Sequence, residues 1–365
     1  MIIWCGLMVS CYKPYTSDID SNEKILVVEG MITNEVANYK IHLSYATLFY
    51  NEDTRQDVNS ASVYVMDDLD NNYPFRKSGN GYYLSDSLQF LGHPGRTYTL
   101  HIETPDGEIY MSNPQRLYPE FYPDTVYAEA DYQETISRFH GIIFNLRRGA
   151  NILINIRSLT DTLPRFRFTS NLVKHYSYNI RRGMTEYQFF AWETDNTILD
   201  INLTHKEYSL NSTSINKHAV YFVDDKLNFE GWIYELGPLQ PDLSYKALAT
   251  YSRQYYLISY RILYLNQYSL NNEAYLYYKS MDEQLRSEGK LFDPIAVQLR
   301  GNINCTTNPA KKTFGFFEAS SVSRTSYDIG FRRYNDQYSV TKIPYILPPE
   351  LYGCWIDKVP PFWGY

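Results

Sequence analysis

The chain has 365 residues and a formal net charge of −7 at pH 7, and tyrosine is frequent, with 37 residues. This length suits two domains and a large core. The acidic balance, without a block of basic residues, excludes a typical nucleic-acid-binding surface, which depends on clustered lysine and arginine. Tyrosine, threonine, valine and isoleucine favour strands, so the composition predicts a mainly β protein.

The chain starts with an apolar run that ends in Ser10 and Cys11. An apolar core before a small residue is typical of a secretion signal, and a cysteine directly after it indicates lipid attachment. The run lacks the usual basic start, and Met8 stands where a branched residue is usual. The alternative is a buried N-terminal strand with a chance cysteine. We expect residues 1–10 to be a signal segment, Cys11 to carry the lipid, and residues 11–23 to form a polar tether.

The lipid at Cys11 is expected to be the only membrane anchor. The N-terminal apolar run is shorter than the roughly 20 residues that span a bilayer. No other stretch reaches the length of a membrane-spanning helix. This places the protein outside the cytoplasm, on a membrane surface.

Short strands separated by turns follow over residues 24–113, which we expect to form a β-sandwich domain. Residues 25–32 have the continuous apolar pattern of a buried strand. Residues 39–45 and 98–103 alternate between apolar and polar side chains, as half-buried strands do.

The segment from Asp68 to Asn72 is dense in turn-forming residues and has oxygen-bearing side chains at alternate positions. A calcium loop needs glycine at its sixth position and glutamate at its twelfth. Here these positions hold Tyr73 and Gly79. The segment is therefore interpreted as a hairpin tip rather than a calcium site.

Residues 114–124 are rich in proline and are expected to link the first domain to a larger β-rich domain over residues 125–365. One amphipathic helix is predicted at about residues 269–288. Ser269 is its expected N-cap, and Gly289 suits its C-terminal end. The helix is expected to pack through one apolar stripe, formed by Ala274, Tyr277, Tyr278, Met281 and Leu285.

The four cysteines have different expected fates. Cys5 falls in the signal segment and Cys11 is the lipid-attachment residue, which leaves Cys305 and Cys354 as an even pair. In an oxidising compartment an even remainder favours a disulfide bond. The alternative is two free buried thiols. No zinc-binding spacing surrounds either cysteine.

Several stretches of the amino-acid sequence resemble an uncharacterised family of Bacteroidota outer-membrane lipoproteins, known as a domain of unknown function. Members are usually encoded beside SusC-like, TonB-dependent transporters. The resemblance implies an N-terminal immunoglobulin-like or carboxypeptidase-regulatory-like sandwich, a larger β-rich domain and a role near nutrient import, and it transfers no catalytic residues. It is carried by SC at 10–11, KPYTSDIDSNEK at 13–24, LVVEGMIT at 26–33, IHLSYA at 41–46, ASVYVMDD at 61–68, PGRTYTLHIETPDGEIYMS at 94–112, EAYLYYKSMDEQLRSEGKLFDP at 273–294 and GFFEASSV at 315–322.

No catalytic motif accompanies these features. The sequence has no HExxH, GxSxG, P-loop or GxGxxG pattern, and we expect neither a cofactor nor a metal. Glu186, Glu193 and Asp195 are candidates for a glycosidase pair, but their spacing does not single them out. Trp192 and Trp232 are candidate aromatic contacts for a ligand, with burial in the core as the alternative.

We therefore expect a non-enzymatic, lipid-anchored protein of the outer membrane that faces the cell surface. Its expected role is that of a binding or accessory component of TonB-dependent uptake. Its expected partners are a TonB-dependent transporter, an oligosaccharide or peptide ligand, and the membrane through the lipid. The alternatives are a surface hydrolase acting on glycan or peptide, and a structural or adhesin-like module.

Overall fold

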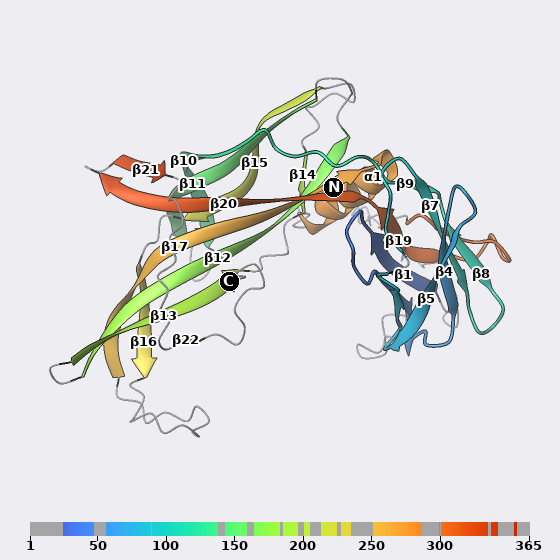
Figure 1. Cartoon of the computed structure of the whole chain (residues 1–365), viewed down its shortest axis with the longest axis horizontal. Helices are drawn as coiled ribbons and strands as arrows, with labels where there is room; N and C mark the ends of the chain where they lie inside the picture. Colours follow the sequence, from blue (N-terminus) through green and yellow to red (C-terminus); the bar gives the residue numbers. More distant parts are fainter. Residues whose placement is uncertain are drawn as a thin grey trace, which may run out of the picture.

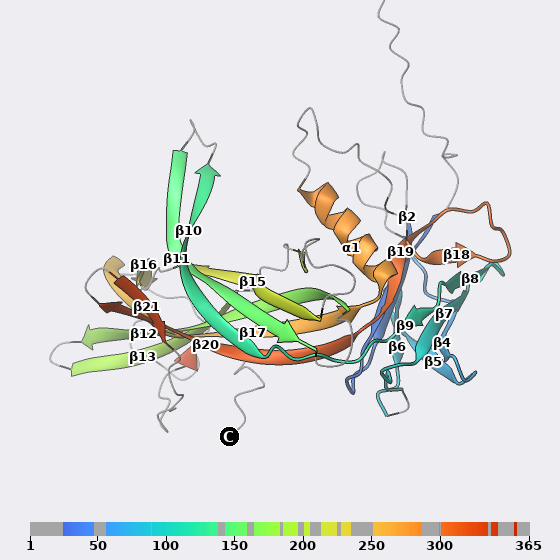
Figure 2. The ribbon, with the colours of Figure 1, turned by 90° about the horizontal axis from the view of Figure 1, so that it is seen from above.

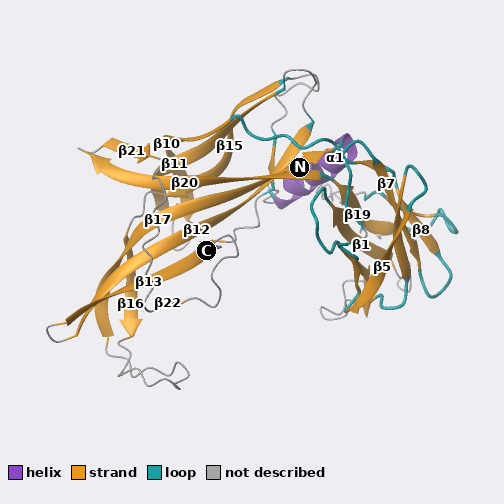
Figure 3. Ribbon diagram, viewed as in Figure 1, coloured by secondary structure: helices purple, strands orange, loops and turns teal. Residues whose placement is uncertain are grey.

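The computed structural model describes residues 25–46, 56–88, 90–137, 143–158, 164–182, 185–195, 201–204, 213–224, 228–234, 251–286, 299, 301–334, 337–341 and 354–355. In this part of the chain almost all regular structure is strand, and one α-helix lies near the centre of the molecule (Figure 3). The prediction of a mainly β protein with one prominent helix is confirmed. The immunoglobulin-like or carboxypeptidase-regulatory-like detail stays a prediction.

The first β-unit is one continuous sheet in the order β18-β8-β7-β4-β5-β6-β2-β1-β19, with β3 paired to β2 and β9 paired to β7 (Figure 1). Its strands are β1 (Ile25–Ile32), β2 (Lys40–Ala46), β3 (Gln56–Asp57), β4 (Ser62–Asp67), β5 (Asn72–Gly79), β6 (Tyr82–Ser85), β7 (Thr97–Glu103), β8 (Ile109–Ser112), β9 (Gln115–Arg116), β18 (Ile303–Cys305) and β19 (Thr313–Ala319).

The sheet curls around an apolar core, and its two ends meet. The core includes Leu26, Ile41 and Leu100, which alternation along their strands turns inward. Asn302 joins the ends, because its side chain accepts from the Phe317 amide at 2.9 Å and donates to the Phe317 carbonyl at 2.8 Å. A nearly closed sheet leaves little unpaired edge.

Strands β18 and β19 come from far along the chain. The sequence places their residues in the domain at 125–365, whereas β19 pairs in parallel with β1, and β18 pairs with β8. The boundary at residue 113 therefore needs amending for residues 303–319. Strand alternation shows that a segment is a strand, but it carries no information about a partner some 280 residues away, so only the structure reveals this pairing.

The second β-unit consists of a three-stranded sheet, β10-β11-β15, and a larger sheet, β21-β20-β17-β12-β13-β22, to which β14 and β16 are added. Its strands are β10 (Thr125–Ser137), β11 (Ile143–Arg157), β12 (Arg165–Arg182), β13 (Thr185–Asp195), β14 (Asn202–Leu203), β15 (Ser214–Asp224), β16 (Asn228–Tyr234), β17 (Tyr251–Leu270), β20 (Ser321–Tyr334), β21 (Gln337–Thr341) and β22 (Cys354–Trp355).

The two sheets of the second unit share a core at the end that faces the first unit. Ile154 of β11 and Val220 of β15 meet Phe166 of β12 and Leu263 of β17 in this core. The long strands β12, β17 and β20 then run away from the first unit, as Figure 1 and the perpendicular view in Figure 2 show. The chain passes almost directly from β19 of one unit into β20 of the other.

The helix α1 (Asn272–Leu285) follows β17 without a loop. Its N-cap is Asn271, whose side chain accepts from the Ala274 amide at 2.8 Å. The expected N-cap Ser269 is wrong, because Ser269 is still paired within the sheet. The apolar stripe is also shorter than expected, since Leu285 is 64% exposed. Gly289 lies outside the described residues.

Two polar clusters fasten α1 between the units. Glu273, in the first turn, accepts from the side chains of Asn113 at 2.5 Å and Gln115 at 2.6 Å. Gln115, which is fully buried, also accepts from Asn271 at 2.6 Å. The second cluster centres on the ion pair between Arg167 of β12 and Glu318 of β19, to which Tyr278 of α1 donates its hydroxyl.

The expected linker at 114–124 packs closely on both units. Gln115 and Arg116 form β9 within the first unit. The carbonyl of Phe121 accepts from Gln267 at 2.7 Å and from Ser323 at 2.6 Å, both in the second unit. The segment is therefore a packed connection held by both units.

Candidate functional site

The candidate site lies on the first unit, at the hairpin tip between β4 and β5. Met66 pairs with Asn72, so residues 67–71 form the tip. Asp70 has a φ of 61°, a left-handed conformation that aspartate tolerates better than most residues. The interpretation of this segment as a hairpin tip is confirmed.

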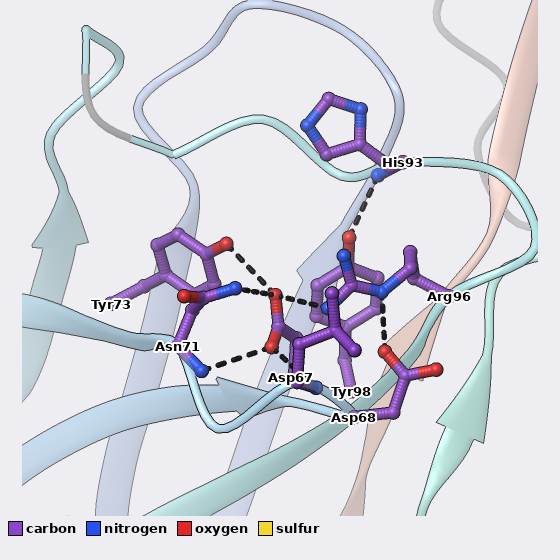
Figure 4. A network of polar contacts seen from close by, with 8 residues as sticks. Asp67, Asp68, Asn71, Tyr73, His93, Arg96 and Tyr98 are labelled. Atoms are coloured by element: carbon purple, nitrogen blue, oxygen red, sulfur yellow. Dashed lines mark hydrogen bonds and ion pairs between the residues drawn. The ribbon is translucent and has the colours of Figure 1, made fainter.

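The carboxylate of Asp67 organises this tip (Figure 4). Its Oδ1 accepts from the backbone amides of Leu69 at 2.9 Å and Asn71 at 3.0 Å. Its Oδ2 accepts from the Asn71 side chain at 3.0 Å and the Tyr73 hydroxyl at 2.9 Å. An ion pair with Arg96, at 2.7 Å from Oδ2, completes the set. These contacts occupy the acceptor positions of the carboxylate, so Asp67 serves the protein rather than a ligand.

These contacts shift two pKa values in opposite directions. Burial alone would raise the pKa of Asp67, but the donors from Asn71, Leu69 and Tyr73 outweigh it and hold the pKa at about 2. Burial, together with donation to Asp67, raises the pKa of Tyr73 to about 12. Asp67 is therefore charged and Tyr73 neutral at physiological pH.

A second turn is fixed beside the hairpin tip. Asp86 Oδ1 accepts from the Leu88 amide at 3.0 Å, and the Asp86 carbonyl accepts from the Phe90 amide at 3.0 Å. The Phe90 ring is buried and stacks on Tyr73, with centroids 4.3 Å apart. The aromatic contact brings the two turns together although they are separate in sequence.

An open cavity of about 520 Å³ lies between the two turns. Its walls combine carboxylate, amide and aromatic side chains. A concave surface with a few polar groups over an apolar floor is typical of a binding site. The lining residues are Asp70, Asn71, Asn72, Tyr73, Pro74, Asp86 and Phe90.

The comparison of sequences identifies the family. Residues 12–326 match the family described as Domain of unknown function (DUF4249). The chain belongs to this family. The match extends through the first β-unit, α1 and part of β20, so it covers the first unit, the junction and the second unit up to residue 326. Neither the comparison with curated proteins nor that with solved structures returned a match.

The candidate lipidation, aromatic and glycosidase residues of this DUF4249 chain lie outside the described part or have side chains there. Cys11 lies outside the described residues. Trp192 is in β13 and Trp232 in β16, and their side chains are outside the described part, as are those of the candidate glycosidase residues Glu186, Glu193 and Asp195 of β13.

Cys305 is a buried free cysteine in β18, with its Sγ 3.4 Å from Thr307 Oγ1. The side chain of Cys354, in β22, lies outside the described residues. The predicted disulfide bond between the two therefore stays a prediction.

The sequence indicates one of the two turns that line the DUF4249 cavity, and it does not indicate the other. The turn formers at 68–72 indicate the first wall, whereas Asp86 and Phe90 stand out only once Tyr73 and Phe90 are seen to stack. The second wall could have been suspected from the turn-forming Ser85-Asp86-Ser87 that shortly precedes the aromatic Phe90.

The described residues hold neither a metal-binding cluster nor a membrane-spanning helix. No group of three or more histidine, cysteine, aspartate or glutamate side chains there lies together in a way suited to a metal ion. No helix in the same part of the chain is long and apolar enough to cross a membrane.

Proposed function

We propose that this protein is a lipid-anchored component of the cell envelope, held at the outer membrane through Cys11 and facing the cell surface. It acts as a binding or accessory component of TonB-dependent nutrient uptake. Its work is to hold a ligand or to dock on the transporter, and it breaks no bond.

The observation that carries this proposal is the cavity on the first unit. Its two walls are preset by the Asp67 contacts and by the Asp86 turn, so little conformational entropy is lost when a ligand enters. Its lining offers acceptors, amides and aromatic rings suited to contact.

Strand polarity supports the proposed orientation. The tether of residues 11–23 leads to the Ile25 end of β1. The cavity lies at the Ile32 end, because Gly92, beyond the Asp86 turn, donates to the Thr33 carbonyl at 3.1 Å. Eight strand residues span roughly 26 Å at about 3.3 Å each. A tether at one end and a cavity at the other suit a protein that presents its binding surface away from the lipid.

The test is recovery of the transporter. The full chain, tagged at its C-terminus, is purified from native membranes in mild detergent at low salt, and co-purifying proteins are identified by mass spectrometry. We expect a large outer-membrane barrel of the TonB-dependent class. A tagged, unrelated lipoprotein of the same membrane is the control. Recovery of the protein alone overturns the transporter role.

A further inference from the structure

The cavity on the first unit carries unbalanced negative charge. Asp70 and Asp86 are the ionisable residues of acidic type in its lining, and the lining contains no lysine, arginine or histidine. The nearest basic side chain in the contact network, Arg96, is committed to Asp67 and Asp68. An anion entering this cavity would meet two carboxylates without a compensating cation, so its binding is disfavoured.

The floor of the cavity suits a cation in a second way. The stacked rings of Tyr73 and Phe90 line the same cavity as the two carboxylates, and Pro74 lines it too. Tyr39 supports the floor, because its ring meets Phe90 edge-on with centroids 5.3 Å apart. Aromatic faces attract ammonium and guanidinium groups, and a guanidinium also stacks flat on a ring.

Two exposed leucines lie next in sequence to the turns that line the cavity. Leu69, on the hairpin tip, is 68% exposed, and Leu88, on the Asp86 turn, is 92% exposed. Each belongs to one of the two turns that form the cavity walls. Single exposed leucines are ordinary, but one on each of the two turns beside the cavity can give a ligand apolar contacts next to the charged centre.

We propose that this cavity binds a peptide through a basic side chain. The guanidinium or ammonium group enters between Asp70 and Asp86 and lies over the Tyr73–Phe90 pair, while apolar neighbours in the peptide cover Leu69 and Leu88. This inference rests on the proposed binding function and names its ligand class. A neutral sugar would leave both carboxylates unneutralised and the two leucines uncovered.

The experiment measures binding of three fluorescent tripeptides to the full chain in mild detergent, by anisotropy. The peptides share leucine at both ends and carry arginine, citrulline or glutamate in the centre. Citrulline has the shape of arginine without its charge. We expect the arginine peptide to bind about tenfold more tightly than the citrulline peptide, the glutamate peptide to bind least, and the arginine preference to shrink as salt rises.

Two double variants assign the effect to the cavity. Asp70→Asn with Asp86→Asn removes the two charges and keeps the fold, because asparagine tolerates the left-handed φ at position 70 and still accepts from the Leu88 amide. This variant is expected to bind arginine and citrulline peptides equally. The matched control, Glu103→Gln with Asp282→Asn, removes two carboxylates elsewhere and is expected to retain the preference.

The proposal is overturned if wild-type protein binds arginine and citrulline peptides equally, if it binds none of the peptides at millimolar concentration, or if the Asp70/Asp86 variant keeps the preference. Recovery of the barrel is a separate readout. A barrel partner without arginine preference overturns the ligand class alone, whereas arginine preference without a barrel overturns the transporter role alone.

Discussion

Arg167 of β12 and Glu318 of β19 form a buried ion pair that joins the two β-units, with one guanidinium nitrogen 3.2 Å from each carboxylate oxygen. Two tyrosine rings flank the guanidinium, Tyr268 at 4.3 Å and Tyr278 at 4.5 Å. Tyr278 also donates its hydroxyl to Glu318. Burial alone would lower the pKa of Arg167, but Glu318 and the tyrosines raise it, so the arginine stays charged at the junction.

Breaking one partner of this pair is expected to be costly. Glu318→Gln keeps the shape and leaves Arg167 buried without a counter-charge, which destabilises the fold by about 3–5 kcal/mol. Urea unfolding of the full chain measures the change. Glutamate 318 is 1% exposed, whereas Arg286, paired with Asp282 on α1, is 66% exposed. Arg286→Gln is the control and is expected to cost less than about 1 kcal/mol.

A double variant separates lost charge balance from lost packing. Arg167→Met with Glu318→Leu removes both charges from the junction, so no uncompensated ion remains. We expect this pair of changes to destabilise the protein less than Glu318→Gln alone. Equal or greater destabilisation would show that the ion pair itself, with its tyrosine cage, is the main stabilising contact.

The acid sensitivity of the hairpin tip follows from the Asp67 pKa of about 2 in the folded protein. The pKa of an aspartate in the unfolded chain is about 3.9. A lowered folded pKa stabilises the fold above the unfolded value and loses this contribution as pH falls towards 2. The contribution is on the order of 2 kcal/mol at neutral pH.

Asp67→Asn provides the measurement. Urea unfolding is followed for wild type and variant between pH 7 and pH 2.5, and the difference between them is expected to shrink steadily below pH 4. Asp282→Asn, at a partly exposed position of α1, is the control and should show a small difference at all pH values. A pH-independent gap between wild type and Asp67→Asn would contradict the assignment of the stabilisation to the charged carboxylate.

The sequence predicts those features of the fold that depend on neighbouring residues, and it does not predict those that depend on contacts between distant segments. Alternation along the chain locates β7 and a continuous apolar run locates β1, because both patterns are local properties of the sequence. The start of α1 is displaced from Ser269 to Asn271, since pairing within β17 extends to Leu270 and overrides a good capping residue. Tertiary contact decides such boundaries.

The candidate site shows the same limit. The turn chemistry at Asp68 to Asn72 identifies one wall of the cavity, yet Asp86 joins it only because Phe90 stacks on Tyr73. Likewise, the sequence around Glu318 contains no pattern that predicts its ion pair with Arg167 across the junction. Pairs of residues brought together by long-range packing carry no periodic signal in a single sequence.

Gly315 of β19 is expected to be intolerant of any side chain. Its φ is +91°, and a β-carbon there would lie 1.8 Å from the Val28 carbonyl oxygen of β1. Gly315→Ala must therefore displace β19 from β1, at a cost of more than about 3 kcal/mol. Gly107, with a φ of +83° and no atom within 4 Å of such a carbon, is the matched control. Gly107→Ala is expected to cost about 1 kcal/mol. Thermal unfolding compares the two, and equal costs would contradict the close approach of β19 to β1.

The anchor prediction has its own test. Cys11→Ser removes the thiol that would carry the lipid, so the variant is expected to leave the membrane fraction for the soluble fraction on cell fractionation. Cys305→Ser is the control, because this thiol is buried in β18 and should not affect localisation. Full retention of Cys11→Ser in the membrane fraction would rule out lipid anchoring at this position.

The pairing of β19 with β1 determines when the first unit can finish folding. The first unit contains the earliest strand of the described chain and is closed by residues 303–319, so it cannot complete its sheet until nearly all of the chain has been delivered. Until then the edge of β1 stays open and able to pair with other chains. A sheet closed in this way forms late, and it depends on the open edge of β1 being kept from premature pairing until residues 303–319 reach it.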